Sequence, residues 1–322
     1  MTAASIAVPA TAPPVSLRRA LRSIHRLEVF PNQLLVLVWG MVAAASRPSD
    51  LWTASAILAL GINGLSLFGG FVLNSYSDYP IDVRSPVKFY VARAVERLGR
   101  RRVLFIYVAE QVITVAMAVV VSELLHTWIF VAVKLIGIGA GYLYNAEPIR
   151  LKRRALWNPV MNSIRMGFVP GLIGYLAVHQ GTIGAGGWIL LGGMTLVTMG
   201  RIGFWVSVMD TDEDTAEGIR TPSVVFGPRR VMITAITAGT LAAVTSGIGL
   251  ILLFGPWGVL GALGGVGAQA YRISLLRQVT DDRSAVSLLQ KRSTICRERL
   301  WDKAIYGGVI AVAIVHLLIV VT

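Results

Sequence analysis

Residues 51–82 read LWTASAILALGINGLSLFGGFVLNSYSDYPID, and the fold is inferred from this stretch first. The segment 51–73 is apolar over about the length of one bilayer crossing. The run then ends on Asn74-Ser-Tyr-Ser-Asp78-Tyr-Pro-Ile-Asp82, which carries two carboxylates and an amide. We therefore expect a membrane-spanning helix whose end presents acidic side chains at the membrane surface.

Eight further windows have similar apolar character. They are residues 30–46, 103–122, 127–145, 158–178, 186–209, 231–254, 257–271 and 304–321. Of the 322 residues, 55% are hydrophobic and 15% are charged, and the mean hydropathy is +0.66. That composition excludes a soluble globule of this size. The sequence predicts an all-α membrane protein, a bundle of about nine transmembrane helices.

The basic residues lie almost entirely in alternate connections between these windows. Of the 30 Lys and Arg residues, 26 fall in the N-terminal segment and in the connections after the second, fourth, sixth and eighth windows. Because cytoplasmic loops carry such an excess, we expect the N-terminus and these connections to be cytoplasmic and the C-terminus to be external. This bias explains the net charge of +13. The expected partner is the lipid bilayer, with no nucleic acid and no protein partner.

The start of the chain differs from the rest in composition. Residues 1–26 hold no long apolar run and are rich in Ala, Pro and Thr at first, which predicts a disordered cytoplasmic tail. Residues 27–322 are then expected to form a single transmembrane domain. The one cysteine, Cys296, excludes an internal disulfide and a zinc site built on cysteines.

A second acidic segment, Asp210-Thr-Asp-Glu-Asp214, ends the sixth window as residues 74–82 end the second. In each segment two aspartates stand four residues apart, which places both on one helix face, although Pro80 is expected to bend or restart the first helix. Segments four windows apart share an orientation. The layout predicts two parallel four-helix halves plus a ninth helix, with an active-site cap on the cytoplasmic side.

The predicted metal ligands and catalytic residues are Asp78, Asp82, Asp210 and Asp214. Such carboxylates suit Mg²⁺, which takes one or two of them together with phosphate oxygens and water. Acids at the C-terminal end of a helix are unfavourable against the helix dipole, so they indicate a compensating cation. The competing interpretation is that they are solvated loop residues. Two matching clusters favour the cation.

Basic and polar residues complete the predicted diphosphate site. The predicted substrate-binding residues are Asn74, Lys88, Arg93, Lys152, Arg153, Asn162, Arg165, Arg201, Arg220 and Tyr144. Many of the loop cations serve topology or anionic lipid equally well. Arg165 and Arg201 lie inside predicted membrane helices, where a charge usually faces the interior of the bundle. Glu110 and Lys134 are also intramembrane, and we expect them to pair with each other.

These features, in this order, resemble the UbiA superfamily of intramembrane prenyltransferases. The matching residues are Asn74, Asp78, Asp82, Asp210 and Asp214, with Tyr144-Asn-Ala-Glu-Pro-Ile-Arg-Leu-Lys-Arg153 and Gly218-Ile-Arg-Thr-Pro-Ser223. The resemblance implies nine helices, acidic motifs on helices 2 and 6, and a Mg²⁺-bound isoprenyl diphosphate between them. The chain departs from the family pattern at Ser75, where Asp often follows Asn, and at Gly218, which replaces a third acid. The usual Arg-Pro pair after the first motif is also missing.

The implied reaction is transfer of an isoprenyl group from an allylic diphosphate to an acceptor. By analogy the acceptor is aromatic, a hydroxybenzoate or a quinone precursor. Three alternatives stay open: a terpene cyclase acting on the same diphosphate, transfer of a phosphoribosyl group to a polyprenyl phosphate, and a membrane transporter. The paired acidic motifs at one membrane face argue against the transporter.

Overall fold

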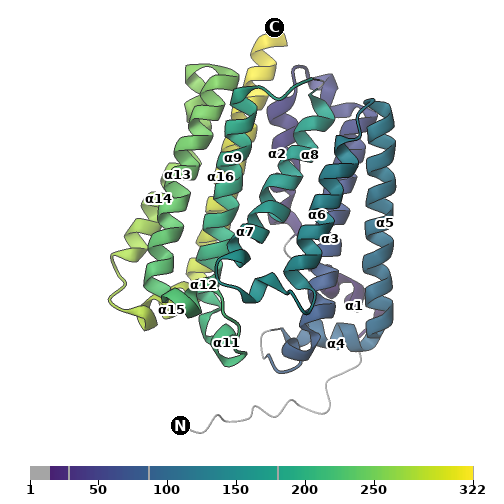
Figure 1. Ribbon diagram of the computed structural model, residues 1–322. Helices are drawn as coiled ribbons and strands as arrows, with labels where there is room; N and C mark the ends of the chain where they lie inside the picture. The colour runs from purple at the N-terminus through teal and green to yellow at the C-terminus, as the bar shows by residue number, and fades with distance from the viewer. Residues whose placement is uncertain (1–14, 28–29, 86–87, 180, 322) are drawn as a thin grey trace.

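The computed structural model describes residues 15–27, 30–85, 88–179 and 181–321, which form helices and loops without a strand (Figure 1). The first half contains α1 (Leu17–Ile24), α2 (Phe30–Ala44), η1 (Pro48–Trp52), α3 (Ala54–Asp82), α4 (Phe89–Leu98), α5 (Arg100–Leu124), α6 (Ile129–Asn145) and η2 (Leu151–Arg153). A continuous rod follows, made of α7 (Trp157–Ser163), the π-helical η3 (Ile164–Phe168) and α8 (Val169–Val178).

The second half begins with a rod of the same construction. It consists of α9 (Ala185–Thr198), the π-helical η4 (Met199–Trp205) and α10 (Val206–Met209). The remaining elements are α11 (Thr211–Ala216), α12 (Pro222–Phe226), α13 (Pro228–Phe254), η5 (Pro256–Ala262), α14 (Leu263–Leu276), α15 (Asp282–Gln290) and α16 (Arg292–Val321).

Six stretches of the described chain are long and apolar enough to cross a membrane. They are Ala54–Asp82, Arg100–Leu124, Ala185–Met209, Pro228–Phe254, Pro256–Leu276 and Arg297–Ile319. Two shorter apolar helices, Leu34–Ala44 and Ile129–Asn145, accompany them. The predicted all-α architecture is confirmed, with six candidate membrane spans.

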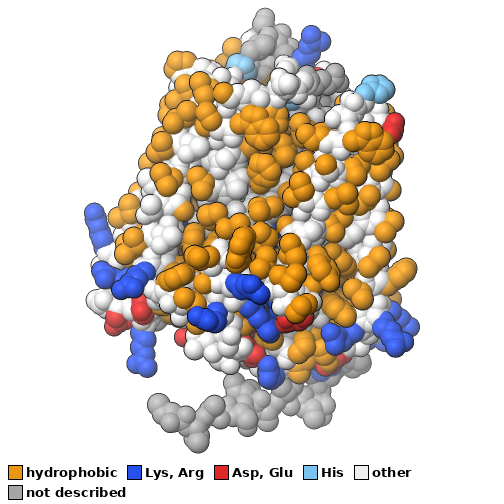
Figure 2. Space-filling model, in the orientation of Figure 1, with side chains coloured by type: hydrophobic (Ala, Val, Ile, Leu, Met, Phe, Trp, Pro, Cys, Tyr) orange, Lys and Arg blue, Asp and Glu red, His pale blue; other side chains and the backbone are white. Residues whose placement is uncertain are grey.

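The long helices run side by side, and the short helices α1, α4, α11, α12 and α15 gather at one end, called here the polar end (Figure 1). On the face shown in Figure 2, hydrophobic side chains cover the long helices, whereas Lys and Arg side chains gather at the polar end. The C-terminus lies at the opposite end of the bundle (Figure 1). The connections in which the sequence concentrates its basic residues therefore meet at one end of the molecule.

Small residues allow the long helices to approach closely, as is common in membrane bundles. A Cβ at Gly40 on α2 would stand 2.3 Å from the carbonyl oxygen of Gly171 on α8. Trp39, next to Gly40, is fully buried at this crossing and belongs to a core cluster that also contains Phe130 and Leu190. This packing fixes α2 and α8 in the middle of the bundle.

Two local expectations are wrong. Helix α3 continues through Pro80 and ends at Asp82, so the helix does not restart at this proline, which lies in its last turn. Part of the segment expected to be disordered forms α1, whose Ala20 and Ile24 are fully buried in a cluster with residues of α3, α4 and α5. The apolar residues of α1 recur at helical spacing within a polar segment, so average composition conceals them. Residues 1–14 lie outside the described part.

Candidate active site

The first acidic segment occupies the last turns of α3, where Asn74, Asp78 and Asp82 face the same cavity. Asp78 forms ion pairs with Lys152 and with Arg150, whose Nη2 lies 2.5 Å from Asp78 Oδ1. The side-chain carbonyl of Asn74 accepts a hydrogen bond from Lys152 Nζ at 3.4 Å. Asp82 is buried, and its Oδ2 has no hydrogen-bond partner among the described residues. The segment thus presents one neutralised carboxylate and one unpaired carboxylate oxygen.

Lys152 is held in place by the loop between α6 and α7. Its backbone carbonyl accepts a hydrogen bond from Asn158 Nδ2 at 2.9 Å, and Arg150 beside it also pairs with Glu147 at 2.9 Å. Burial lowers the pKa of Lys152 to about 8, although the neighbouring Asp78 acts in the opposite direction. A buried ammonium that is easily neutralised gains from a further anion beside it.

The second acidic segment lies at the junction of α10 and α11, where Asp210, Glu213 and Asp214 line the same cavity. Asp214 Oδ2 accepts a hydrogen bond from Thr221 Oγ1 at 2.8 Å, and Glu213 pairs with Lys88 at 2.9 Å. Asp212 instead accepts a hydrogen bond from Gln290 Nε2 at 3.3 Å and does not line the cavity.

The helix-dipole argument is wrong for this second segment. Asp212, Glu213 and Asp214 fall in the first turn of α11, where acidic side chains are favoured. The short helix α11 restarts after Asp210, which the apolar pattern of the sequence does not reveal. The case for a cation therefore rests on burial and mutual repulsion of the carboxylates, not on the dipole.

Burial and repulsion both disfavour the ionised forms of these acids. Burial raises the pKa of Asp214 to about 7, and the nearby Asp210 adds to the increase although Thr221 opposes it. Burial likewise raises the pKa of Asp210. For Lys88, burial lowers the pKa, but Asp210 and Glu213 together raise it above its usual value. This corner of the cavity therefore holds three carboxylates beside Lys88, and Arg26 also acts to lower the pKa of Asp210.

The wall between the two acidic segments is built from α6, α7 and the two π-helical segments. Asn162 Nδ2 donates hydrogen bonds to the Tyr144 hydroxyl at 3.2 Å and to Asn158 Oδ1 at 3.0 Å. The guanidinium of Arg165 lies over the Tyr144 ring, 4.8 Å from its centroid. Arg165 lies in η3 and Arg201 in η4, so each of these two arginines stands on a π-helical segment, a feature frequent at functional sites.

Arg201 reaches the cavity but is also paired. It forms an ion pair with Asp302 of α16, and a second buried pair joins Arg272 to Glu298 at 2.7 Å. The charge of Arg201 is therefore largely matched by the protein itself.

The close approach of η4 to α7 depends on Gly203, because a Cβ there would stand 2.3 Å from the Cβ of Pro159.

One cavity of about 430 Å³ joins these groups. The predicted site residues that line it are Asn74, Asp78, Asp82, Lys88, Tyr144, Lys152, Asn162, Arg165, Arg201, Asp210 and Asp214. Arg93, Arg153 and Arg220 do not line it. Arg153 pairs with Glu147 at 3.2 Å, and Arg220 forms a backbone bridge with Arg154.

The cavity also contains residues absent from the predicted set. Arg26, Glu213, Thr221 and Glu298 line it, and Arg150 stands behind Asp78. Arg150 and Glu213 lie within the quoted motifs, so their positions in the sequence were a usable signal. Arg26 follows the segment that forms α1 and Glu298 belongs to α16, and no motif marks either of them.

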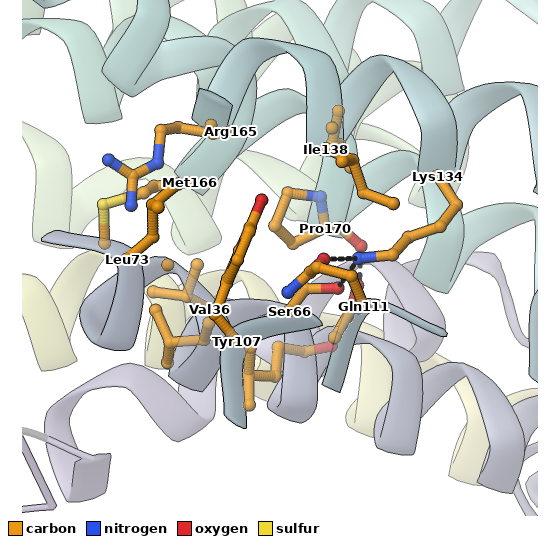
Figure 3. A pocket seen from close by; sticks show the side chains of 17 residues that line it. Val36, Ser66, Leu73, Tyr107, Gln111, Lys134, Ile138, Arg165, Met166 and Pro170 are labelled. Atoms are coloured by element: carbon orange, nitrogen blue, oxygen red, sulfur yellow. Dashed lines mark hydrogen bonds between the residues drawn. The ribbon is translucent and has the colours of Figure 1, made fainter. Parts of the chain in front are cut away.

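The predicted Glu110–Lys134 pair is wrong. Glu110 accepts a hydrogen bond from the His25 ring at 2.8 Å. Lys134 donates to Ser66 Oγ at 2.6 Å and to Gln111 Oε1 at 3.0 Å (Figure 3). Glu110 and Gln111 are neighbours on α5 and both approach Gly69 of α3, but only Gln111 contacts Lys134. The sequence places charges at similar depth but does not decide which helix faces meet.

The donor set of the main cavity fits a hard divalent cation that takes few protein ligands. Within the described ranges, no three His, Cys, Asp or Glu side chains are grouped closely enough to hold a metal ion by themselves. Asp82 Oδ2 and Glu213 Oε1 are nevertheless buried without a hydrogen-bond partner. Mg²⁺ commonly binds through one or two carboxylates together with substrate phosphates, so these residues fit Mg²⁺ better than a metal that needs a full protein cage.

Comparisons with known proteins agree on one family. The family model described as the UbiA prenyltransferase family matches residues 34–295. A 4-hydroxybenzoate octaprenyltransferase of Alkalilimnicola ehrlichii is 23% identical over 251 residues, covering 75% of this chain and 78% of that protein. The bacteriochlorophyll synthase 33 kDa chain of Rhodobacter capsulatus is 26% identical over 212 residues, covering 63% of this chain and 66% of its own length.

A solved structure extends the likeness to the fold. The structure of a UbiA homolog from Archaeoglobus fulgidus, bound to DMAPP and Mg²⁺, superposes with a TM-score of 0.72. The alignment covers 93% of this chain and 99% of that chain at 13% sequence identity. At this identity, the agreement concerns the helical architecture.

Proposed function

Since the chain belongs to the UbiA prenyltransferase family and is a prenyltransferase, we propose that it transfers an isoprenyl group from an allylic diphosphate to an aromatic acceptor with the help of Mg²⁺. Residues 27–322 are taken to act as one catalytic domain.

One observation carries the proposal. Two acidic segments about 130 residues apart in the sequence line one cavity, and buried or half-buried cations stand beside each of them. Asp82 and Asp210 add two more carboxylates, and neither forms an ion pair with a cation among the described residues. A Mg²⁺-diphosphate brings positive charge to the acids and phosphate oxygens to the cations. Without such a ligand, Asp82 Oδ2 and Glu213 Oε1 in this cavity stay buried without a hydrogen-bond partner among the described residues.

Asp82, Asp210 and Asp214 are the proposed metal ligands, with Asp78 contributing beside Lys152. When bound, Mg²⁺ would offset the charge that develops on the leaving diphosphate oxygens. Lys88 and Lys152 would bind the same oxygens through charge-assisted hydrogen bonds. The Tyr144 ring, packed under Arg165, offers an electron-rich face to an allylic carbon that gains positive charge.

The proposed reaction breaks the bond between the allylic carbon and the bridging diphosphate oxygen, whose electron pair leaves with the diphosphate. A ring carbon of the acceptor then forms a bond to the allylic carbon, and the ring loses a proton. Inorganic diphosphate and the prenylated acceptor are the products. The relatives named as 4-hydroxybenzoate octaprenyltransferases support an aromatic acceptor. The Mg²⁺ and DMAPP bound in the Archaeoglobus homolog support an allylic diphosphate as the donor.

We also propose the finer topology that the sequence predicts. Nine membrane crossings, in two four-helix halves with a ninth helix added, would place the polar end and the N-terminus on the cytoplasmic side. The six candidate spans, the two shorter apolar helices and the continuous rod Trp157–Val178 support this count. The C-terminus would then be external, which is consistent with its position at the other end of the bundle (Figure 1).

The test is turnover by the purified protein with Mg²⁺ and geranyl diphosphate, with and without an aromatic acceptor such as 4-hydroxybenzoate or 1,4-dihydroxy-2-naphthoate. We expect diphosphate release that depends on both Mg²⁺ and an acceptor. Release of a cyclic hydrocarbon or alcohol without any acceptor would assign the site to a terpene cyclase. Transfer only when a phosphoribosyl diphosphate and a polyprenyl phosphate are supplied would assign it to the phosphoribosyl reaction.

A further inference from the structure

A second, smaller cavity adjoins the main one inside the bundle. It has a volume of about 50 Å³ and is lined by residues of α2, α3, α5, α6, η3 and α8. Arg165 and Met166 line both cavities, so their side chains form the wall between them. Figure 3 shows Arg165 on one side of this side cavity, Lys134 on the other and Tyr107 between them.

Lys134 is the unusual group in the side cavity. It is only 2% exposed, and two of its three N–H donors are used by the neutral acceptors Ser66 and Gln111. Across the described ranges, no carboxylate lies within 4.0 Å of its Nζ. A buried ammonium without a counter-charge is costly, and such charges inside membrane segments mark binding sites more often than structural contacts.

The rest of the lining suits a flat ligand with a polar end. Asn63 donates from Nδ2 to the carbonyls of Leu37 and Pro170, which leaves its buried Oδ1 without a hydrogen-bond partner. Gly141 lines the same cavity, and a Cβ built there meets nothing within 4 Å. The side cavity therefore combines a charged donor, a free acceptor and an uncrowded glycine surface.

Size and charge together decide what this cavity accepts. A volume of 50 Å³ holds roughly three to five water molecules, too little for an isoprenoid tail but enough for one polar end of a larger ligand. An apolar tail would also leave the Lys134 ammonium unpaired. A carboxylate fits both the volume and the charge.

We infer that the side cavity receives the acidic end of the acceptor and that Lys134 binds its carboxylate. The inference rests on the proposed function, because it takes the main cavity as the site of the diphosphate. The ring of the acceptor would lie past Met166, toward Arg165 and Tyr144. Along α6, Lys134 stands ten residues from Tyr144, or about 15 Å at the usual helical rise, a span that the acceptor and the allylic end of the donor would bridge together.

The test measures binding of acceptor analogues in the absence of any diphosphate. The probes are benzoate, 2-naphthoate and biphenyl-4-carboxylate, each compared with its primary amide, which has the same shape and no charge. We expect the wild-type protein to bind at least one carboxylate roughly tenfold to a hundredfold more tightly than its amide, the usual range for a charge-assisted hydrogen bond. Lys134→Met, which keeps the length of the side chain, should abolish this preference, and Lys134→Arg should retain part of it.

Two controls keep the outcomes distinct. Lys303→Met removes an exposed lysine on α16 and should leave the preference unchanged. Mg²⁺-dependent binding of a diphosphate to Lys134→Met should equal that of the wild type, which also shows that the variant is folded. The inference is overturned if no carboxylate is preferred over its amide, or if the preference survives in Lys134→Met. If the wild-type protein itself does not bind the diphosphate, the proposed function is overturned, whether or not carboxylates bind.

Discussion

At the scale of single residues, neighbouring cations in the same loop have different surroundings. Lys152 is buried beside Asp78 at the cavity, whereas Arg153 is partly exposed, pairs with Glu147 and does not line the cavity. We expect Lys152→Met to lower turnover by about 10²–10³-fold, as for removal of one well-placed charge in an active site.

Arg153→Met is the matched control, and it should change turnover by less than about threefold because exposed ion pairs contribute little. Steady-state kinetics at saturating Mg²⁺ compare the two variants directly. Equal losses in both would show that Lys152 acts through the fold of the loop and not at the diphosphate.

Arg201 requires a different design because it is paired with Asp302. Arg201→Leu alone leaves a buried carboxylate without a partner, which typically costs about 3–5 kcal/mol of folding stability. The double variant Arg201→Leu/Asp302→Leu removes both charges, so it should recover most of that stability in a thermal melt. Turnover should stay low in both variants if Arg201 contacts substrate.

The control for this pair is Arg101→Leu on the exposed start of α5, which should retain wild-type turnover and stability. Wild-type turnover in the double variant would assign Arg201 to structure alone. That outcome would remove one predicted substrate-binding residue without affecting the acidic segments.

At the scale of helices, the site depends on how closely η4 approaches α7. A Cβ at Gly203 would collide with Pro159, and overpacking of this kind costs about 1–3 kcal/mol. We expect Gly203→Ala to lower the melting temperature and to reduce turnover, because the strain falls between Arg201 and Asn162. Thermal unfolding monitored by circular dichroism measures the first effect.

Gly192→Ala provides the comparison within the same rod. Gly192 lies in α9, is exposed, and has open space where a Cβ would stand. This change should be neutral or slightly stabilising, since Ala is the better helix former. A Gly203→Ala protein as stable and active as Gly192→Ala would contradict the close contact between η4 and Pro159.

The helices themselves were largely predictable, since a long apolar run identifies a membrane helix without knowledge of its neighbours. The i, i+4 spacing likewise placed Asp78 and Asp82 on one face, and both line the cavity. The predictions that were wrong concerned contacts between different helices. Glu110 pairs with His25, which directly follows α1, and not with Lys134. The hydropathy pattern of a helix does not reveal which of its faces contacts which neighbour. Helices α1 and α11 are short and polar, so hydropathy does not reveal them.

At the scale of the whole molecule, the proposed topology places every long connection of the polar end on one side of the membrane. Single cysteines introduced at positions 101 and 283, in a Cys296→Ser background, should be labelled from the same side by an impermeant thiol reagent. A cysteine at position 47 should be labelled only from the other side. Labelling of positions 101 and 283 from opposite sides would eliminate the nine-crossing arrangement.

In the proposed enzyme, the two acidic segments together hold one Mg²⁺-diphosphate. Calorimetric binding of the unreactive analogue geranyl thiolodiphosphate to the wild type, Asp78→Asn, Asp214→Asn and the control Asp212→Asn tests it most directly. Each Asp→Asn change preserves side-chain volume, and Asp212 does not line the cavity. We expect binding to require Mg²⁺ and to disappear with EDTA. It should be at least about tenfold weaker in Asp78→Asn and in Asp214→Asn, and unchanged in Asp212→Asn. Binding that is independent of Mg²⁺, or equally tight in all four proteins, would contradict it.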